Sequence, residues 1–314
     1  MKFTIAIPAY KDVFFREAIE SVINQTCKDW ELIILNDFSP ENIEKIAQEY
    51  ITESRIRYYK NEKNVGAYNL VDNWNRCLEL AQGEFLICMG DDDVLREDCL
   101  EVYQKYISQY PDYDIYHAAT ELIDEKSEFF RYQESRPLTE SVYSMVWHRL
   151  TRKRDQYVGD FLYKVSHLRS KGGFYKLPLA WGSDDITAYR CSMRHGILNI
   201  PEYIFKYRVS RYTISRSGNT REKLEAIALK YEWICDNIIT SKPESDVDNH
   251  YREMIDACLP SAKQKEVMSL IGYSNDRLTF RYLRNVSKFC KSNHVNFSIF
   301  CAGMLYRILL RNRG

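Results

Sequence analysis

Several features that would place this chain in a common class of protein are missing from its sequence. Lys and Arg total 44 and so do Asp and Glu, so the 314 residues lack the excess of cations that a nucleic-acid-binding protein carries. No apolar run reaches the roughly 20 residues that span a bilayer. The nine cysteines show no close CxxC spacing, so we expect reduced thiols in a cytoplasmic protein rather than a zinc or redox site. Residues 2–7 are strand-like, and we expect no secretory signal.

Short β-type runs alternate with helical patterns through the first part of the chain. The strand-like segments are 3–7, 31–35, 56–59, 85–89 and 114–121. Between them apolar residues recur at helical spacing. This alternation predicts an α/β fold with a mostly parallel sheet between helices, in which ligands bind beyond the carboxyl ends of the strands. The pattern becomes helical and polar near residue 219, so we predict a catalytic domain over 1–218 and a helical C-terminal extension over 219–314.

The first two strands end in residues that could contact a nucleotide. The turn Pro8-Ala9-Tyr10 lacks the glycines of a dinucleotide-binding fingerprint, and Tyr10 offers a flat ring instead. The second strand is followed by Asn36-Asp37, where a carboxylate can accept hydrogen bonds from a base or a ribose. Capping of the next helix by Asp37 is the alternative.

Three consecutive aspartates, Asp91, Asp92 and Asp93, follow the fourth strand and Gly90. Their carboxylates repel one another at the mouth of a buried strand. A divalent cation relieves this repulsion, and oxygen ligands suit Mg²⁺ or Mn²⁺. Gly90 lets the backbone approach a ligand closely. A solvated acidic turn is the alternative, although the position at the functional edge of the sheet favours a metal site.

A second acidic pair, Asp184-Asp185, lies in a glycine-containing turn before a helix-like segment at 186–193. Such a pair can be a helix cap and nothing more. Taken together with the aspartates after the fourth strand, it looks like a general base that faces a metal site.

The order and spacing of these segments resemble the inverting glycosyltransferases of family 2, which have the GT-A fold, over about residues 4–216. Pro8-Ala9-Tyr10 is similar to the motif whose aromatic ring packs on the nucleotide base. Asn36-Asp37 is similar to an Asp-Asp turn whose second carboxylate recognises uracil. Further similar segments are 18–26, 64–66, 73–75 and 81–85. Asn36 and Trp74 depart from the Asp and Arg that the family has there.

The resemblance implies a role for each site residue. Asp92, the last residue of the metal motif, binds a divalent cation, Mn²⁺ or Mg²⁺, and Asp91 contacts the ribose or a metal-bound water. Asp184 is the catalytic base, with Asp185 as the second candidate. The nucleotide-sugar donor contacts residues at the strand ends: Pro8, Ala9, Tyr10, Asp12, Asp37, Asn64, Gly66, Asn75, Gly90 and Asp91. The segment 207–215 resembles a loop that closes over the donor, with Ser210 where the family often has a histidine.

Such an enzyme transfers a sugar from a nucleotide-diphosphate sugar, with a UDP-sugar favoured, to a saccharide or lipid-linked acceptor. By analogy its setting is bacterial surface polysaccharide synthesis. A nucleotidyltransferase would need a Gly-rich basic loop after the first strand, and a phosphatase with an Asp nucleophile would have its acidic motif there. A nucleotide-sugar-binding subunit without turnover stays open as an alternative, because Asn36, Trp74 and Gly90 depart from the family pattern.

The charge is unevenly distributed at the C-terminal end. Residues 261–314 contain 10 Lys and Arg against 2 Asp and Glu, a net charge of +8. They include an apolar segment at 295–310, which is too short to span a bilayer but suits an interfacial helix among cations. This pattern predicts a cytoplasmic protein in peripheral contact with an anionic membrane. Docking of the helix on the protein's own core or on a second subunit, as in a homodimer, is the alternative.

Overall fold

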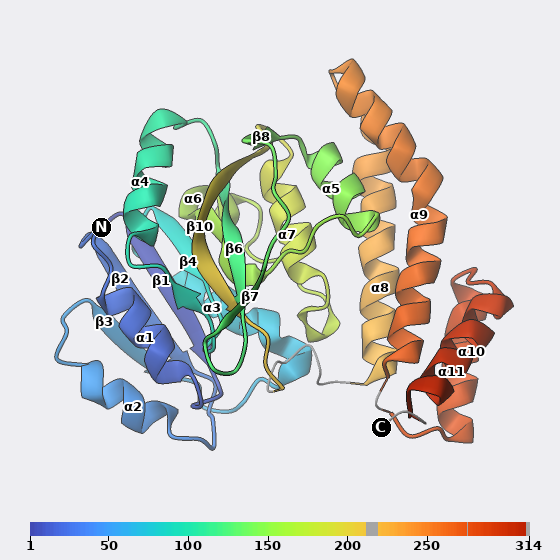
Figure 1. Cartoon of the computed structure of the whole chain (residues 1–314), viewed down its shortest axis with the longest axis horizontal. Coiled ribbons are helices and arrows are strands. Elements are labelled where there is room, and N and C mark those ends of the chain that lie inside the picture. The colour runs from blue at the N-terminus through green and yellow to red at the C-terminus, as the bar shows by residue number, and fades with distance from the viewer. Residues whose placement is uncertain (212–218, 275, 312–314) are drawn as a thin grey trace.

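Strands and helices alternate in the first part of the chain, as the sequence predicted (Figure 1). The computed structural model describes residues 1–211, 219–274 and 276–311. The strands are β1 (Phe3–Ala9), β2 (Trp30–Asn36), β3 (Ile56–Lys60), β4 (Phe85–Cys88), the two-residue β5 (Val94–Leu95) and β6 (Ile115–Ile123). The helices are α1 (Phe15–Ile23), α2 (Ile43–Tyr50), α3 (Leu70–Leu80) and α4 (Cys99–Gln109).

The centre of the sheet is parallel and buried. β1 pairs in parallel with β2 and with β4, and β2 pairs in parallel with β3. Every residue of β2 and β4 is buried, which explains why these strands are mostly apolar rather than alternating. Because these strands run in parallel, the turns after β1, β2 and β4 meet at one edge of the sheet. The predicted α/β fold class is therefore confirmed, whereas binding of a ligand at this edge stays a prediction.

The rest of the sheet is mixed, and part of it was not foreseen. The elements after β6 are β7 (Phe129–Tyr132), β8 (Thr139–Glu140), α5 (Val142–Leu150), β9 (Phe161–Lys164), α6 (Val165–Ser170), α7 (Ser183–Ser192) and β10 (Ile197–Arg208). The strand order is β3-β2-β1-β4-β9-β6-β10-β5, with β7 beside β6 and β8 beside β10. β9 is antiparallel to both β4 and β6, and it is only four residues long. β10 runs parallel to β6 and brings Arg208 to the same edge as the turn after β4.

A helical extension completes the chain, as predicted. It consists of α8 (Thr220–Ile234), a π-helical turn (Cys235–Ile239), α9 (Asp246–Gly272), α10 (Phe280–Ser292) and α11 (Phe297–Arg311). In Figure 1, α8 and α9 lie beside α5 and α7, and α10 and α11 lie on the far side of α9. Among the described residues, no helix combines the length and the apolarity that crossing a bilayer requires.

Two hydrophobic cores lie on the two faces of the sheet. One contains residues of α1, α2 and α4. The other contains residues of α3 and α5–α7 and continues without a break into α8 and α9, where Leu224, Ile227 and Ile255 are buried in it. The domain boundary at residue 218 remains a prediction, because this second core joins the two predicted domains.

The second helix begins later than the sequence indicated. Ser39 followed by Pro40 predicts a helix start at residue 40, whereas α2 starts at Ile43 with Asn42 as its N-cap. The Ser39 hydroxyl instead donates to the Tyr10 carbonyl (2.6 Å) and accepts from the Glu41 backbone N–H (3.0 Å). Ser39 thus connects the turns after β1 and β2, a tertiary role that competes with helix capping.

Candidate active site

Asp91 fastens the turn after β4 to the turn after β1. One of its carboxylate oxygens accepts from the backbone N–H groups of Tyr10 (2.6 Å) and Lys11 (2.7 Å). Burial and the charge of Asp92 raise the pKa of Asp91 to about 7, even though the two N–H donors favour the charged form. This carboxylate therefore fixes the backbone at Tyr10, next to which Lys11 places its ammonium 5.2 Å from the Tyr10 ring centroid.

Asp37 organises a small buried amide network at the end of β2. Its carboxylate accepts from the Asn61 side chain (2.8 Å), the Asn64 side chain (2.9 Å) and the Val65 backbone N–H (3.0 Å). Its own N–H donates to the carbonyl of Ala9, which follows Pro8 at the end of β1. Asp37 does not cap α2, since Asn42 takes that position. The structure therefore brings Ala9, Asp37 and Asn64 together, as the resemblance implied.

Gly66 and Asn75 are the next two residues for which the sequence predicted contact with the donor. Gly66 has a φ of 74°, in the left-handed region that favours glycine, and it starts the turn before α3. Asn75 faces elsewhere: its side chain accepts from the Phe174 N–H (2.7 Å) and donates to the Phe174 carbonyl (3.1 Å). Asn75 thus holds the segment before α7 against α3, which makes it a positioning residue.

Arg76 and Asn61 belong to this region but were missed by the sequence reasoning. The Arg76 guanidinium donates to the Asn61 side-chain carbonyl, and Asn61 also binds Asp37 and Asn73. Trp74, at the position where the family has an arginine, is buried against Phe174 instead. Arg76 follows Trp74 by two residues, and this arginine was the signal in the sequence from which a cation near Asp37 could have been predicted.

Asp12 lies between β1 and α1, and its side chain contacts the start of α2. Its carboxylate accepts from the backbone N–H (3.2 Å) and the side-chain amide (2.9 Å) of Asn42. These hydrogen bonds lower the pKa of Asp12. The carboxylate thus supports the helix start next to the donor edge, and its predicted contact with the donor stays a prediction.

The acidic turn after β4 divides its three carboxylates among different partners. Asp93 is buried and accepts from the backbone N–H groups of Gly90 (3.2 Å) and Arg208 (3.1 Å). A Cβ at Gly90 would lie 2.8 Å from an Asp92 oxygen and 2.9 Å from an Asp93 oxygen, so the crowded turn requires glycine. Burial, together with the neighbouring carboxylates, raises the pKa of both Asp92 and Asp93.

Asp92 fits a divalent cation that is shared with a substrate. With Asp91 held by the turn after β1 and Asp93 held by Arg208, Asp92 is left beside its own N–H and the Ser210 hydroxyl. Within the described ranges, no three His, Cys, Asp or Glu side chains converge into a closed metal site. Mg²⁺ and similar ions are commonly bound by one or two carboxylates plus substrate phosphates. The residues therefore fit an ion that needs the donor to complete its coordination.

Arg208 supports the acidic turn from beneath and was not singled out by the sequence. Its completely buried side chain donates to the Asp92 carbonyl (2.8 Å), pairs with Glu17 (2.6 Å) and lies 4.2 Å from the Phe14 ring centroid. A buried cation at this place offsets part of the negative charge of the aspartates. Of the predicted loop at 207–215, residues 212–215 lie outside the described residues.

Asp184 and Asp185 have different environments at the start of α7. Asp185 is buried, and one of its oxygens accepts from Arg149 Nε (2.9 Å) and from the Gln156 side chain (2.9 Å). Burial and the charge of Asp185 raise the pKa of Asp184 to about 7. The Arg149 guanidinium therefore stabilises the negative charge of Asp185. The raised pKa of Asp184 suits a base that works near neutral pH.

Tyr207 links the two acidic groups in space. Its pKa is raised by burial and by the charges of Asp93, Asp92 and Asp184. Its ring stacks on Tyr157, with the ring centroids 3.7 Å apart. The fold thus places the aspartates after β4 and the acid at the start of α7 within electrostatic reach of one side chain, although they are about ninety residues apart in sequence.

The sequence is similar to known glycosyltransferases over part of its length. The family model described as Glycosyl transferase family 2 matches residues 4–177. An uncharacterized glycosyltransferase of Methanocaldococcus jannaschii is 32% identical over 121 residues, which are 38% of this chain and 40% of the relative. The GalNAc(5)-diNAcBac-PP-undecaprenol beta-1,3-glucosyltransferase of Campylobacter jejuni is 32% identical over 101 residues, which are 32% of each chain. The aligned segments span less than half of these relatives' own lengths.

Solved structures share the fold over almost the whole chain. S. aureus TarS 1–349 in complex with UDP-GlcNAc has a TM-score of 0.66 and 15% identity, and the match covers 96% of this chain and 84% of that one. The mannosyltransferase PcManGT of Pyrobaculum calidifontis, in complex with GDP-Man and Mn²⁺, has a TM-score of 0.59 and 13% identity over 98% and 87% of the two chains. At these identities the likeness shows a shared GT-A fold.

Proposed function

Because the chain belongs to glycosyl transferase family 2, we propose that it transfers a sugar, with inversion, from a nucleotide-diphosphate sugar to a saccharide or lipid-linked acceptor. The observation that supports this most is the contact between the turns at the edge where the parallel strands end: Asp91 accepts from the backbone of Tyr10 and Lys11, and the Asp37 N–H donates to the Ala9 carbonyl. We propose that the chain acts in the synthesis of a bacterial surface polysaccharide. The names of two relatives point to this setting, because one is a glucosyltransferase for an undecaprenol-linked glycan and the other is a teichoic acid biosynthesis protein.

Asp184 acts as the general base. As the acceptor oxygen forms a bond to the anomeric carbon, the bond to the diphosphate breaks and the acceptor proton passes to Asp184. A single attack from the face opposite the leaving group inverts the configuration. General-base catalysis of this kind contributes roughly 10²–10⁴-fold to the rate.

Asp92 is the residue that would hold Mn²⁺ or Mg²⁺ with the donor. When bound, the ion supplies stabilisation of the charge that grows on the diphosphate. Arg208 and Gly90 position the Asp92 backbone and allow its carboxylate the space that it needs. Asp91 holds Tyr10 in place from the same turn.

The base of the nucleotide lies, in this proposal, between the Tyr10 ring and the Asp37 network. A UDP-sugar is the favoured donor, because the family resemblance assigns uracil recognition to the position of Asp37. The buried amides of Asn61 and Asn64 fix the Asp37 carboxylate, so its direction is set before a ligand binds.

Donor hydrolysis tests this function directly. Release of UDP or another nucleoside diphosphate from a panel of nucleotide sugars is measured with Mn²⁺ and with EDTA. Metal-dependent release supports the proposal that the protein is a glycosyltransferase. Thermal shift identifies the donor, because a ligand that binds the folded state raises the melting temperature of the protein. A donor that binds and raises the melting temperature but is never turned over, with any acceptor, would favour the alternative of a nucleotide-sugar-binding subunit.

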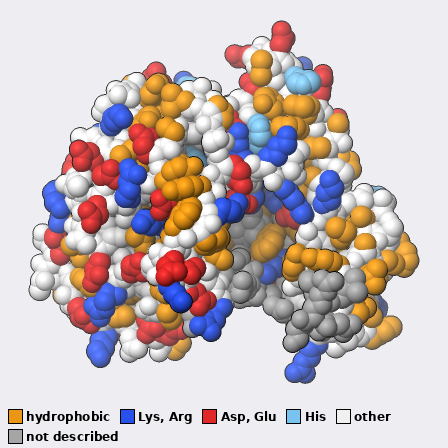
Figure 2. Space-filling view, in the orientation of Figure 1, with side chains coloured by type: hydrophobic (Ala, Val, Ile, Leu, Met, Phe, Trp, Pro, Cys, Tyr) orange, Lys and Arg blue, Asp and Glu red, His pale blue; other side chains and the backbone are white. Residues whose placement is uncertain are grey.

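The two last helices are proposed to contact an anionic membrane from the cytoplasmic side. α11 packs on α9 through Gly303, and the buried Arg307 donates to the Asp276 carbonyl and lies over the Tyr282 ring of α10. The helix exposes an apolar stripe of Phe297, Cys301, Leu305 and Ile308. On α10, Phe280 is 83% exposed beside Arg281 and Arg284. Figure 2 shows hydrophobic side chains gathered over this end of the molecule.

Apolar side chains surrounded by cations suit the surface of an anionic bilayer. The alternative of docking on the protein's own core accounts for the face with Gly303 and leaves the apolar stripe outward. The other alternative is a homodimer that forms through this stripe. Sedimentation with liposomes distinguishes membrane contact from dimer formation.

A further inference from the structure

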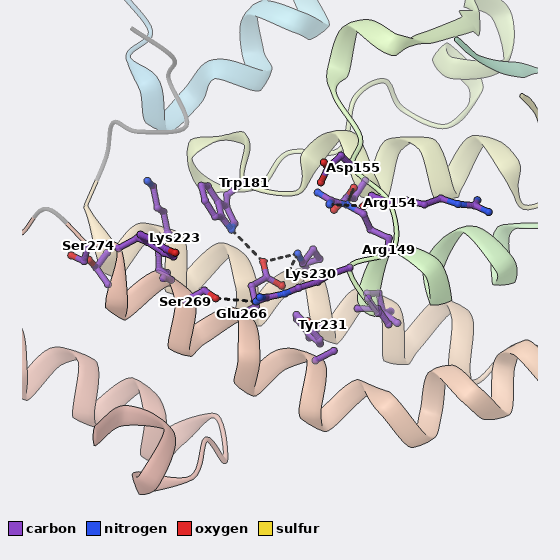
Figure 3. A pocket seen from close by; sticks show the side chains of 18 of the residues that line it. Arg149, Arg154, Asp155, Trp181, Lys223, Lys230, Tyr231, Glu266, Ser269 and Ser274 are labelled. Carbon is purple, nitrogen blue, oxygen red and sulfur yellow. Dashed lines mark hydrogen bonds and ion pairs between the residues drawn. The ribbon is translucent and has the colours of Figure 1, made fainter. Parts of the chain in front are cut away.

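A cavity of about 690 Å³ lies between the catalytic part of the chain and the C-terminal helices (Figure 3). Its walls come from α5 and the turn after it, from α7, and from α8 and α9. This volume lies within the range of small-molecule binding sites. Asp185 is among the described residues that line it, whereas Tyr10, Asp37 and Asp92 are not. The cavity is therefore separate from the proposed donor residues and reaches Asp185, the residue next to the proposed base in the sequence.

A hydrogen-bonded group in the cavity wall connects the C-terminal helices to the turn that bears the base. Glu266 of α9 accepts both from Lys230 of α8 (2.8 and 2.9 Å) and from the Trp181 indole N–H (3.3 Å), as Figure 3 shows. Trp181 is followed directly by Gly182, the N-cap of α7. The position of Asp184 is thus coupled to α8 and α9 through one carboxylate.

The cavity contains both ring faces and hydrogen-bonding groups. Trp181 and Tyr231 contribute aromatic surface, while Lys230, Glu266 and Ser269 contribute donors and acceptors. Aromatic rings with an apolar face and convergent polar groups suit a ligand that has C–H faces and many hydroxyls. A saccharide or polyol has this chemistry.

The cavity wall carries five cations against four carboxylates, which are those of Asp155, Asp185, Glu266 and Asp276. Its five cations are Arg149, Arg152, Arg154, Lys223 and Lys230. Figure 2 shows Lys and Arg side chains along the hollow between the sheet and the C-terminal helices. Four of the five face a carboxylate: Asp185, Glu140 and Glu266 bind Arg149, Arg154 and Lys230, and the charge of Asp276 acts on Lys223.

Arg152 differs from the other four cations in its partners. Its two described hydrogen bonds go to the Lys265 carbonyl and the Ser269 hydroxyl, both 3.0 Å away and both neutral. Lys223 lies 4.8 Å from the Trp181 ring centroid, and burial lowers its pKa. The described hydrogen bonds of Arg152 thus go to neutral groups alone, which favours an anionic ligand beside this residue.

We propose that this cavity binds the acceptor, and that the acceptor is a saccharide or polyol that carries a phosphate group. The proposal rests on the proposed glycosyl transfer. The acceptor hydroxyl points toward Asp184 past Asp185, its rings or carbons lie on Trp181, and Arg152 binds the phosphate. Arginine suits this role because its planar group donates two parallel hydrogen bonds to phosphate oxygens. The phosphate can belong to a polyol phosphate chain or to the diphosphate of a lipid-linked saccharide.

Replacement of Arg152 tests the proposal, with the next residue as its control. Arg152→Gln removes the cation from the cavity, and Lys153→Gln removes an exposed cation that does not line it. For a phosphorylated acceptor, we expect the KM to rise tenfold or more in Arg152→Gln, with less than a twofold change in the KM for the donor. Lys153→Gln keeps both constants. Equal acceptor KM in the two variants would overturn the proposal.

Three acceptor preparations distinguish the sources of the phosphate. They are a short polyol phosphate oligomer, a polyisoprenyl-diphosphate-linked saccharide in detergent, and the same saccharide without phosphate. Use of either phosphorylated acceptor, with dependence on Arg152, supports the proposal and identifies the source. Preferential use of the unphosphorylated saccharide, without dependence on Arg152, contradicts it.

A binding measurement separates this proposal from the proposed function. Calorimetric titration of the protein, saturated with UDP and Mn²⁺, with the polyol phosphate oligomer and with the lipid-linked saccharide reports the cavity without any transfer. Binding of either that is lost in Arg152→Gln and kept in Lys153→Gln supports the acceptor site, even if donor hydrolysis fails. Donor hydrolysis without such binding of either ligand keeps the proposed function and rejects the cavity as the site of a phosphorylated acceptor.

Discussion

Asp184→Asn is the sharpest test of the proposed chemistry. The substitution conserves shape and removes the proton acceptor at the start of α7. If Asp184 is the base, kcat falls by about 10²-fold or more while donor affinity is retained. A 100-fold loss corresponds to about 2.7 kcal/mol of transition-state stabilisation. The donor site is unaffected, since Asp184 takes no part in the Tyr10, Asp37 and Asp91 network.

The pH dependence of the parent protein provides a second sign. Burial and Asp185 raise the pKa of Asp184 to about 7, and a general base works only when deprotonated. Thus kcat should fall as the pH decreases below about 7, and it should level off above that value. In Asp185→Asn, the loss of a neighbouring negative charge lowers the pKa of Asp184, and Arg149 acts in the same direction. The fall in kcat therefore moves to lower pH in this variant.

The assay is single-turnover transfer from a saturating donor between pH 5 and 9, with donor affinity measured separately by calorimetry. Asp185→Asn is the matched control, because its side-chain oxygen can still accept from Arg149. A greater loss of kcat in Asp185→Asn than in Asp184→Asn would move the base to Asp185. A parent profile without any decrease below pH 7 would refute the assignment of the raised pKa to the catalytic base.

Three further variants test the other parts of the site. Asp92→Ala should abolish metal-dependent donor binding, measured by calorimetry with Mn²⁺; unchanged binding would reject Asp92 as the ligand. Tyr10→Ala should weaken donor binding by roughly 1–3 kcal/mol if the ring stacks on the base, and unchanged affinity for UDP would exclude that contact. Leu305→Glu on the apolar stripe of α11 should reduce sedimentation with anionic liposomes, whereas Val247→Glu at the exposed start of α9 should not. Failure of the parent to sediment at low salt would exclude the membrane contact, and a concentration-dependent dimer would favour the second subunit.

The donor edge was predictable because its signals are local. The buried parallel strands β1, β2 and β4 are mostly apolar, and a polar turn follows each of them. Parallel pairing then requires Tyr10, Asp37 and Asp91 to meet at one edge. By contrast, β9 is four residues long and antiparallel, and no local pattern distinguishes such a strand from other short apolar segments.

The roles within the acidic groups depended on partners that are remote in sequence. Asp184 and Asp185 are adjacent and chemically identical, so the sequence alone left both open as the base. The difference between them comes from Arg149 on α5, which pairs with Asp185 and not with Asp184. In the same way, the partner of Arg208 is Glu17, which lies near the other end of the catalytic part of the chain.

The sequence by itself therefore determined the fold class, the family resemblance and the turns that hold the candidate site, because strand burial and turn chemistry depend on neighbouring residues. Only the tertiary structure decided which carboxylates position the backbone and which are left for chemistry, and it alone revealed the cavity beside Trp181. The physical reason is that charge and burial act through space. The pKa of Asp184 depends on burial, on Asp185 and on Arg149 of α5, and the cavity wall around Arg152 is built from α5, α7, α8 and α9, which only folding brings together.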